Sequence, residues 1–512
     1  MSSRVSRPNA RAGCSRSESG RIGYGIVSEF PAAIYSETVL AVNFADAQRY
    51  FLDALLEIHY AHTLMLARQG IVPVAVAQRC LEGLDSLDRA ELAHASYDGK
   101  YEDLFFHVEA ALERACGPEN AGHMHTARSR NDIDITQYRM RLRREILDVV
   151  SAVDALRKVL LGIARDHLRT IMPGYTHTQP AQPTTLAHYL LAVIEMLGRD
   201  ARRLQAAFAT VNRNPLGACA ITTTGFPIDR HFTTELLGFE GLQLNSYGAI
   251  AATDYVTETA GAIATTMVNL GKVTQDCLLW STAEFGFLRL SDAWVQISSI
   301  MPQKRNPVAF EHVRILASKA LGQAQSILIA SHNTPFGDIV DSEDDLQPLV
   351  FTMTAEALRA LRLLAGVMAD CEVNVARMAE RAHADFLSVT ELADTLVRSG
   401  QMSFREAHHI VSAAVRRLRG NYSPDAMVDA ILNTTAVGTP RAVLLKALDP
   451  ANFVEVRRIP GGPAMEPMLD AIREAEIEIA QTGTWLASKT ALLEGYPGRI
   501  YEARQSLLAG TR

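Results

Sequence analysis

Apolar side chains recur at alternating intervals of four and three residues over three long stretches of the chain. The three series are Leu142, Ile146, Val149, Val153, Leu156, Leu160 and Ile163; Val256, Ala260, Ile263, Met267, Leu270, Thr274 and Cys277; and Ala317, Leu321, Ala324 and Leu328. This spacing places an apolar stripe along one side of a helix, with the period of helices that pack lengthwise. We therefore expect a bundle of long helices, a shape that favours oligomers.

Strand patterns are weak in the rest of the chain. It contains no repeated alternation bounded by turn dipeptides, and no predicted strand that leads through G-x-G-x-x-G into a helix. Glycine and proline gather instead at Met172-Pro173-Gly174, Asn214-Pro215-Leu216-Gly217, Gly225-Phe226-Pro227, Met301-Pro302 and Pro460-Gly461-Gly462-Pro463. We expect these clusters to be loops between helices, in an all-α fold.

Composition narrows the class of protein. Of the residues, 48% are apolar and 21% are charged, and this apolar content is too high for a disordered chain. The length of 512 residues is enough for several domains. A net charge of -7 disfavours a nucleic-acid partner, because phosphate binding needs a basic face. No uninterrupted apolar stretch reaches the roughly 18 residues of a membrane span, so no membrane partner is expected.

Cysteine usage and the N-terminal composition bear on location. The six cysteines are scattered without a C-x-x-C pair, which indicates a reducing, cytoplasmic setting and no zinc ribbon or disulfide framework. Residues 1–25 are rich in Arg and Ser, as in a disordered tail, although an organellar transit peptide fits that composition too. They lack the apolar segment of a secretory signal.

Four polar clusters, at residues 123–132, 174–183, 217–230 and 298–311, interrupt the helical pattern. Taken singly, each fits a helix cap or a solvated surface. Together they supply cations (Arg130, Lys304), amides (Asn131, Gln179, Asn306), hydroxyls (Thr126, Ser129, Thr176) and one imidazole (His177). Such a set suits a small dicarboxylate ligand.

Two other kinds of site are disfavoured. His123 and His125 form an H-x-H pair, but no carboxylate, histidine or cysteine follows at metal-ligand spacing, so no metal is expected. Ser298 and His177 could suggest a hydrolase, yet the chain has no G-x-S-x-G motif.

The polar clusters carry a family resemblance. SSIMPQKRNP, which is followed by Glu311, resembles the signature loop of the aspartase/fumarase superfamily. HTARSRND, GYTHTQPAQP, PLG…TTTGFPIDR, LLWSTAEFGF and FREAHHIV resemble its argininosuccinate lyase branch, over residues 35 to 415. The adenylosuccinate lyase and fumarase branches are disfavoured by HTARSRND and by the lack of a basic nucleotide-phosphate loop.

The resemblance implies three largely helical domains. We place them at residues 26–127, 128–373 (the long-helix bundle) and 374–512, after a tail at 1–25. It also implies a homotetramer in which the central helices form a twenty-helix core, with each active site built from three subunits.

The resemblance further implies reversible anti-elimination of fumarate, without a cofactor, through an aci-carboxylate intermediate. Ser298 is the expected general base and Lys304 its electrostatic support, while His177, oriented by Glu311 of another subunit, assists the leaving amine. The expected substrate-binding residues are Ser129, Arg130, Asn131, Thr176, Gln179, Ser299, Met301, Lys304 and Asn306. Retention of these residues argues against a non-enzymatic scaffold.

The chain departs from argininosuccinate lyases where they hold the amine. Where argininosuccinate lyases have Gly-Ser in the first long helix, this chain has Ile58-His59. Their Tyr-Asn-Lys/Arg-Asp-Leu-Gln-Glu-Asp-Lys segment corresponds to residues 338–346, where Asp338 replaces the Tyr and Glu343 replaces the Gln. Gly248 replaces an Asp. Ile297 replaces the Gly before the signature serines. The added acids suit a compact cationic amine, and His59 and Tyr60 could contact a second carboxylate, unless these changes are neutral.

The predicted substrate is therefore a small aminocarboxylate. The departures favour ethylenediamine-N,N'-disuccinate, which would yield fumarate and N-(2-aminoethyl)aspartate. The alternative is argininosuccinate, which would yield fumarate and arginine.

Overall fold

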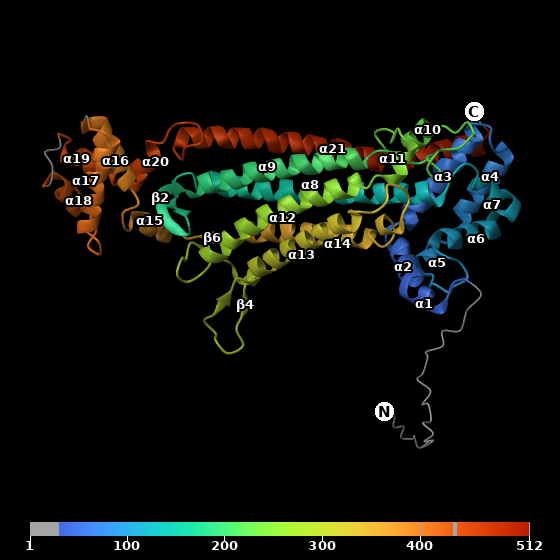
Figure 1. The fold of residues 1–512 in the computed structure, drawn as a ribbon, viewed down its shortest axis with the longest axis horizontal. Helices are drawn as coiled ribbons and strands as arrows, with labels where there is room; N and C mark the ends of the chain where they lie inside the picture. Colours follow the sequence, from blue (N-terminus) through green and yellow to red (C-terminus); the bar gives the residue numbers. More distant parts are fainter. Residues whose placement is uncertain (1–29, 401, 434–437, 511–512) are drawn as a thin grey trace, which may run out of the picture.

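The computed structural model describes residues 30–400, 402–433 and 438–510. The predicted tail at 1–25 lies outside the described residues. The described chain is mostly helical and elongated, with long helices side by side in the middle and smaller groups of helices at the two ends (Figure 1). The helical fold class predicted from the apolar spacing is thus confirmed.

Short helices form the N-terminal end of the molecule. They are α1 (Ala33–Tyr35), the π-helical turn η1 (Ser36–Leu40), α2 (Ala41–Tyr50), α3 (Leu52–Arg68), α4 (Val74–Ser86), α5 (Arg89–His94), α6 (Leu104–Cys116) and α7 (Pro118–Met124). Their apolar faces share one buried cluster, which includes Leu56, Ile58 and Val108. This cluster packs against the beginning of the long bundle through Ile133 and Met140.

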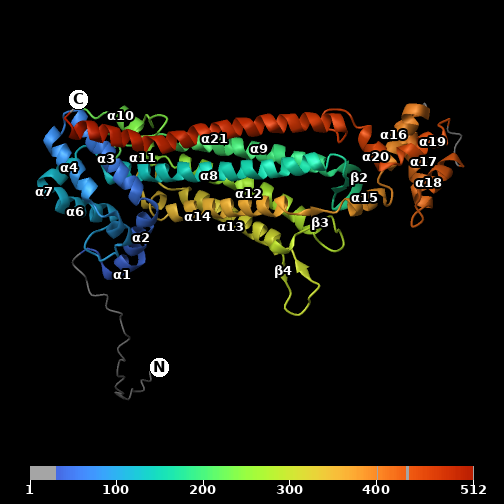
Figure 2. The same cartoon turned by 180° about the vertical axis from the view of Figure 1, so that it is seen from behind.

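Five long helices form the central bundle, and a sixth runs back along it. The five are α8 (Arg130–Asp166), α9 (Leu186–Val211), α12 (Asp254–Trp280), α13 (Val308–Ser331) and α14 (Gln347–Ala369), and the sixth is α21 (Met465–Leu508). Both views of the ribbon show them nearly parallel (Figures 1 and 2). The short helices α10 (Arg230–Leu236) and α11 (Ser246–Ala251) lie near the N-terminal end.

Two of the three predicted apolar stripes are buried as expected. On α8 the series from Leu142 to Leu160 is buried and Ile163 is half-buried, and on α12 every member is buried. The α13 prediction is wrong in part, since Leu328 is 42% exposed. The buried stripe there includes Val313, Ala320 and Ile327 instead. Helix α13 also carries apolar side chains on its exposed side, namely Ile315 and Ile329, so its apolar residues alone do not identify the buried side.

The described strands are short and pair as three two-stranded antiparallel sheets. They are β1 (Ile171–Thr176) with β2 (Gln179–Thr185), β3 (Leu288–Arg289) with β6 (Glu372–Val373), and β4 (Gln296–Ile297) with β5 (Arg305–Asn306). The expectation of a loop at Met172-Pro173-Gly174 is wrong, because these residues lie in β1. The sheet has only two strands, so its prolines can occupy edge positions that need no ladder hydrogen bond.

Another set of short helices lies beyond the bundle, at the end opposite the N-terminal helices. It comprises α15 (Val375–His383), α16 (Val389–Gly400), α17 (Phe404–Arg417), α18 (Pro424–Leu432), α19 (Arg441–Ala447) and α20 (Pro450–Glu455). These helices have a separate buried cluster, which includes Leu396, Met427 and Leu444. Helix α21 then packs on α8 and α9 and reaches α3. The predicted domain boundaries stay a prediction.

Among the described residues, no helix is long and apolar enough to cross a bilayer.

Candidate active site

The predicted site residues fall into three groups within one chain. The first group, at the start of α8, is Ser129, Arg130 and Asn131. The second, on the β1–β2 hairpin, is Thr176, His177 and Gln179. The third, on the β4–β5 hairpin and the first turn of α13, is Ser298, Ser299, Met301, Lys304, Asn306 and Glu311. No hydrogen bond or ion pair links one group to another among the described residues.

The first group begins the longest bundle helix. Ser129 is the N-cap residue of α8, and its Oγ donates to Asn131 Oδ1 at 2.8 Å. Asn131 Nδ2 in turn donates to the carbonyl of Ala220 at 3.3 Å. The positive end of the helix dipole and these polar side chains together favour an anion at this end of α8.

Arg130 lies between carboxylates and an aromatic ring. It forms an ion pair with Asp103 and lies 3.6 Å from Glu102, and its guanidinium lies 5.4 Å from the Phe106 ring centroid. Burial lowers the pKa of Arg130, but the charges of Asp103 and Glu102 outweigh burial and raise it. Arg130 is thus a fixed, half-exposed cation.

A buried carboxylate joins the first group to the polar cluster at 217–230. Asp132 Oδ1 accepts the backbone N–H of Ser129 at 3.0 Å, and Oδ2 accepts those of Gly217 and Cys219 at 2.7 and 2.9 Å. Gly217 has φ 89°, and a Cβ there would lie 2.7 Å from Arg230 Cγ. Both the turn and this close approach require glycine.

The acid-rich segment at 338–345 also lies at this end. Tyr138, on α8, donates its hydroxyl to Asp344 Oδ1 at 2.6 Å. Burial, reinforced by a hydrogen bond that the protonated Glu343 carboxyl donates to neighbouring Asp338, raises the pKa of Glu343 to about 8, while Arg130 opposes that shift. The pKa of half-buried Asp134 is also raised, first by the loss of hydration and then by Asp344. The acids therefore gather around Arg130.

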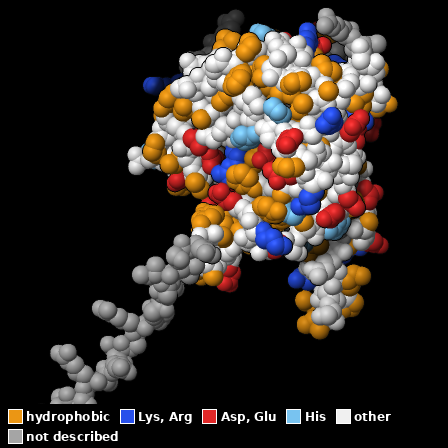
Figure 3. All heavy atoms as spheres, turned by 90° about the vertical axis from the view of Figure 1, so that its right-hand side faces the viewer, with side chains coloured by type: hydrophobic (Ala, Val, Ile, Leu, Met, Phe, Trp, Pro, Cys, Tyr) orange, Lys and Arg blue, Asp and Glu red, His pale blue; other side chains and the backbone are white. Residues whose placement is uncertain are grey.

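Two of the departures from argininosuccinate lyases lie in segments that pack together. Tyr247, next to Gly248, stacks on Phe336, near Asp338, with 5.8 Å between ring centroids. Figure 3 looks onto this end of the molecule, where acidic, basic and histidine side chains gather near the centre of the face. Of the other departures, Glu343 lies near Arg130, while Ile297 lies in β4 on the hairpin of the third group.

His59 is not placed as the sequence suggested. His59 is fully buried, and its Nδ1 accepts a hydrogen bond from Arg128 at 2.7 Å. Burial and then the Arg128 charge hold the pKa of His59 well below its ordinary value. Tyr60 donates to Asp85 at 2.8 Å. The idea that His59 contacts a second carboxylate is wrong, because its side chain is fully buried. For Tyr60 the idea stays a prediction.

The second group occupies a tight two-residue turn. His177 and Thr178 connect β1 to β2 with φ of 49° and 58°, which is the left-handed backbone of a type I′ hairpin. A β-branched residue such as Thr rarely adopts this conformation, and strain of this kind gathers at functional sites. The turn leaves His177 exposed beside Thr176 and Gln179.

The third group lies on a hairpin that projects from the bundle in both ribbon views (Figures 1 and 2). Half-buried Ser298 follows β4, and its Oγ accepts the backbone N–H groups of Ile300 at 3.4 Å and Met301 at 3.1 Å. Ser299 and Lys304 are exposed on the same loop. Two amide donors thus point at one hydroxyl oxygen.

The hairpin is held by polar contacts around its strands. Asn306 Nδ2 donates to the carbonyl of Gln296 at 3.1 Å, and Arg305 bonds the carbonyl of Leu290 at 2.8 Å and pairs with Asp292. Glu311 follows in the first turn of α13, with its side chain exposed. Apolar side chains cover the downward projection in Figure 3, and Ile300 is 82% exposed.

The first and second groups are too far apart to meet within one chain. Helix α8 has 37 residues and separates the first group from the β1–β2 hairpin by about 55 Å at 1.5 Å per residue. A small dicarboxylate cannot contact both ends of such a helix.

The described residues contain no cluster of three or more His, Cys, Asp or Glu that could hold a metal ion. His125 lies 3.4 Å from Glu109, which also contacts Arg128. His125 of the H-x-H pair therefore belongs to a polar cluster of the N-terminal helices.

Sequence reasoning missed three buried polar residues that position the first group, namely Arg128, Asp132 and Tyr138. Asp132 could have been found, since Ser129 and Asp132 have the spacing of a capping box. The contacts of Arg128 with α3 and of Tyr138 with Asp344 span many residues, and no local pattern indicates them.

Comparison with known families gives two matches. Residues 57–322 match the family described as Lyase, and residues 386–455 match the one described as Argininosuccinate lyase C-terminal. Argininosuccinate lyase 2 of Agrobacterium fabrum is 42% identical over 453 residues, which cover 87% of this chain and 90% of that protein. Argininosuccinate lyase of Methanoculleus marisnigri is 37% identical, over 90% and 94%.

Solved structures give a complementary match. EDDS lyase in complex with formate superposes with a TM-score of 0.84 at 32% identity, covering 90% of this chain and 93% of that one. An EDDS lyase variant with bound fumarate has the same TM-score at 31% identity, covering 94% and 99%.

Proposed function

We propose that the substrate of this protein is ethylenediamine-N,N'-disuccinate. The chain belongs to the argininosuccinate lyase and EDDS lyase branch of the aspartase/fumarase superfamily, and it is a carbon–nitrogen lyase that releases fumarate. The products would be fumarate and N-(2-aminoethyl)aspartate. In the reaction a base removes a Cβ proton, the aci-carboxylate collapses, and the C–N bond breaks as the amine leaves with a proton.

The proposal that Ser298 is the base rests on one observation, the pair of backbone N–H groups of Ile300 and Met301 that point at its Oγ. A serine hydroxyl is a poor base unless its oxyanion is stabilised. Hydrogen bonds to the charged form and a nearby cation lower the pKa of such a group. The loop supplies the amides, and Lys304 would supply the cation.

The other proposed roles follow the chemistry of each side chain. Lys304 and Asn306 would hold the carboxylate that gains charge, with Ser299 and Met301 beside it on the loop. Ser129, Arg130 and Asn131 would bind the succinyl carboxylates at the α8 N-terminus, together with Thr176 and Gln179. His177 would assist the leaving amine, oriented by Glu311 of another subunit.

These proposed roles require an oligomer, in which residues of different chains form one active site. Since α8 keeps the first and second groups about 55 Å apart, a complete site has to combine groups from different chains. We propose a homotetramer with a twenty-helix core and with each site shared by three subunits. Its expected mass is about 224 kDa, four times 56.0 kDa.

The choice of substrate is supported by the acids beside Arg130. Asp338 and Glu343 lie where argininosuccinate lyases carry different groups, and they share a hydrogen bond. Ionised carboxyl groups at these positions attract a protonated amine nitrogen of the ethylenediamine part of this substrate. The structural similarity to EDDS lyase agrees with this choice.

Argininosuccinate is the second candidate substrate, favoured by the 42% identity to argininosuccinate lyase 2. An amine panel separates the two candidates. The protein is incubated with fumarate and one amine at a time, and loss of fumarate absorbance is followed. We expect addition with ethylenediamine and N-(2-aminoethyl)aspartate. Turnover with arginine and none with these amines would favour the second candidate.

The role of Ser298 is tested by Ser298→Ala. We expect kcat to fall by about 10²- to 10⁴-fold with the oligomer intact. The matched control is Ser326→Ala, on the exposed side of α13, where Oγ bonds only the carbonyl of Gly322. A Ser298→Ala protein as active as the control would show that another group is the base.

A further inference from the structure

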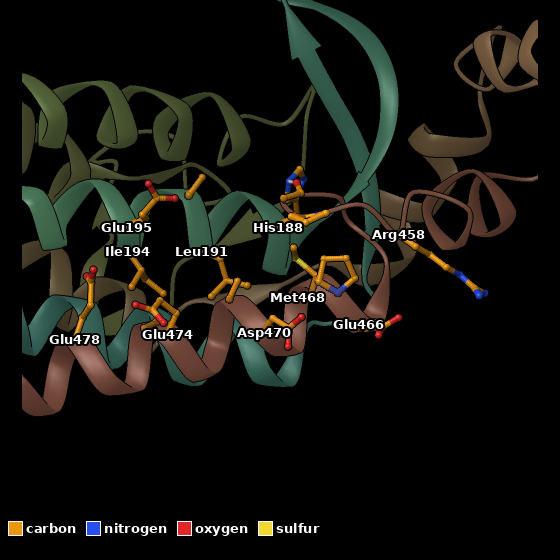
Figure 4. Close-up of a pocket in the computed structure, with 16 residues that line it drawn as sticks. His188, Leu191, Ile194, Glu195, Arg458, Glu466, Met468, Asp470, Glu474 and Glu478 are labelled. Atoms are coloured by element: carbon orange, nitrogen blue, oxygen red, sulfur yellow. Dashed lines mark hydrogen bonds between the residues drawn. The ribbon is translucent and has the colours of Figure 1, made fainter.

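A groove of about 670 Å³ lies between α9 and the beginning of α21, apart from the three groups described above (Figure 4). Its floor is apolar and comprises Leu191 and Ile194 of α9 with Pro467, Met468 and Ala475 of α21. One end is closed by the loop at Pro460 and Gly461, which is fixed because His188 Nε2 bonds the Gly461 carbonyl at 3.0 Å.

One wall of the groove is a row of carboxylates. Glu466, Asp470, Glu474 and Glu478 follow one another at four-residue intervals along α21. Figure 4 shows them in sequence along that helix, with Glu195 of α9 on the other side. Four residues of α-helix rise about 6 Å, so the row repeats at about that spacing.

The carboxylates differ in how far they are neutralised within the protein. Glu478 accepts hydrogen bonds from Arg157 at 3.0 Å and Arg202 at 2.9 Å, and Asp470 pairs with exposed Arg473. Glu466 and Glu474 make no hydrogen bond or ion pair with any residue that the structure describes. They flank Asp470 on the row, and both are exposed. Two unneutralised charges therefore lie about 12 Å apart above an apolar floor.

We propose that this groove binds a linear aliphatic polyamine. Ammonium groups separated by short methylene chains match carboxylates that repeat along a helix, while the methylenes cover the apolar floor. The row repels anions, and the described residues offer no three-ligand cluster for a metal ion. The inference does not depend on the proposed reaction, because none of its residues belongs to the three site groups.

The test uses the intact protein and isothermal titration calorimetry with spermidine. We expect one binding site per chain. Glu474→Gln should weaken binding by about two- to fivefold, and Glu466→Gln with Glu474→Gln by about tenfold, since an exposed ion pair contributes about 0.2–1 kcal/mol. The matched control is Glu494→Gln, which removes the same charge from an exposed position further along α21 and should leave affinity unchanged.

Two further ligands test whether binding needs several ammonium groups on one aliphatic chain or only positive charge. Butylamine has one ammonium group and should bind at least tenfold more weakly than spermidine, and magnesium at equal ionic strength should not displace spermidine. Thermal unfolding of each variant checks that the fold is intact. Absence of spermidine binding, equal weakening by Glu494→Gln, or full displacement by magnesium would overturn the proposal.

Discussion

Glu343 shows how one side chain can make stability depend on pH. Burial and the hydrogen bond with Asp338 raise its pKa to about 8, above the ordinary 4.5. A carboxyl with a raised pKa binds its proton more tightly when folded, so its contribution is complete below pH 4.5 and is lost as the pH rises through 8. We expect Glu343→Gln to flatten the fall in Tm between about pH 5 and 9.

Thermal unfolding across that range provides the measurement. Asp341→Asn, an exposed carboxylate in the same loop, is the control and should keep the wild-type slope. If Glu343→Gln keeps that slope as well, Glu343 is not the group that titrates.

Proton uptake by Glu343 also bears on binding of the amine. A cationic amine beside the acids favours ionised Glu343, so a substrate that reaches Asp338 and Glu343 should release a proton near pH 7. Calorimetry in buffers of different ionisation enthalpy measures this release. We expect release from the wild-type protein and little from Glu343→Gln. Equal release from both would place the amine elsewhere.

Residue types and their order along the chain indicate which side chains are candidates for the site, but they do not indicate the tertiary contacts of these side chains. Asp338 and Glu343 could be singled out because they replace other groups in the family pattern. His59 was misjudged, because its neighbours Arg128 and Phe105 come from distant parts of the chain. Burial of a polar residue depends on such tertiary contacts, which local sequence does not contain.

At the scale of the element, Asp132 holds the beginning of α8 and the 217–230 loop together. It is fully buried, and its carboxylate accepts three backbone N–H groups. Asp132→Ala leaves these donors without an acceptor, so we expect unfolding to become easier by about 3 kcal/mol. Asp148→Ala, exposed on the same helix, should cost less than about 0.5 kcal/mol. Urea unfolding compares them, and equal midpoints would contradict the role of Asp132.

Helices were easier to predict than hairpins. The α8 and α12 stripes repeat over many turns, so single exceptions do not hide the period. The β1–β2 hairpin has prolines at 173, 180 and 183 and a non-glycine turn at His177 and Thr178, and each feature counts against a strand or a tight turn. Surrounding packing has to impose that hairpin, and α15 lies against β1.

At the scale of the whole molecule, the length of α8 decides how a site can form. Arg130 begins this helix, and His177 lies beyond its other end, while the Ser298 hairpin projects outward. No sequence pattern contains the distance between these residues, and the resemblance alone implied shared sites. The length of α8 supports the proposal that a site combines residues of different chains. An oligomer smaller than a trimer could not supply three groups from three chains.

Sharing predicts that two inactive variants restore each other. Consider a site that takes Ser298 from one chain and Arg130 from another. In mixed tetramers of Ser298→Ala and Arg130→Gln, this site is intact only when the chain that supplies Ser298 carries Arg130→Gln and the chain that supplies Arg130 carries Ser298→Ala. Random assembly of equal amounts makes about one quarter of the sites intact. We expect about a quarter of wild-type activity from co-expressed, differently tagged chains purified through both tags, after correction for the tag selection.

The matched control pairs Ser298→Ala with Lys304→Met. Both residues lie on the β4–β5 loop, so every site receives them from one chain and carries one substitution or the other. This mixture should therefore show no recovery, although its tetramers form in the same way. If activity returns in both mixtures, the recovery does not depend on sites shared between chains. If activity returns in neither mixture, each site takes Arg130 and Ser298 from the same chain.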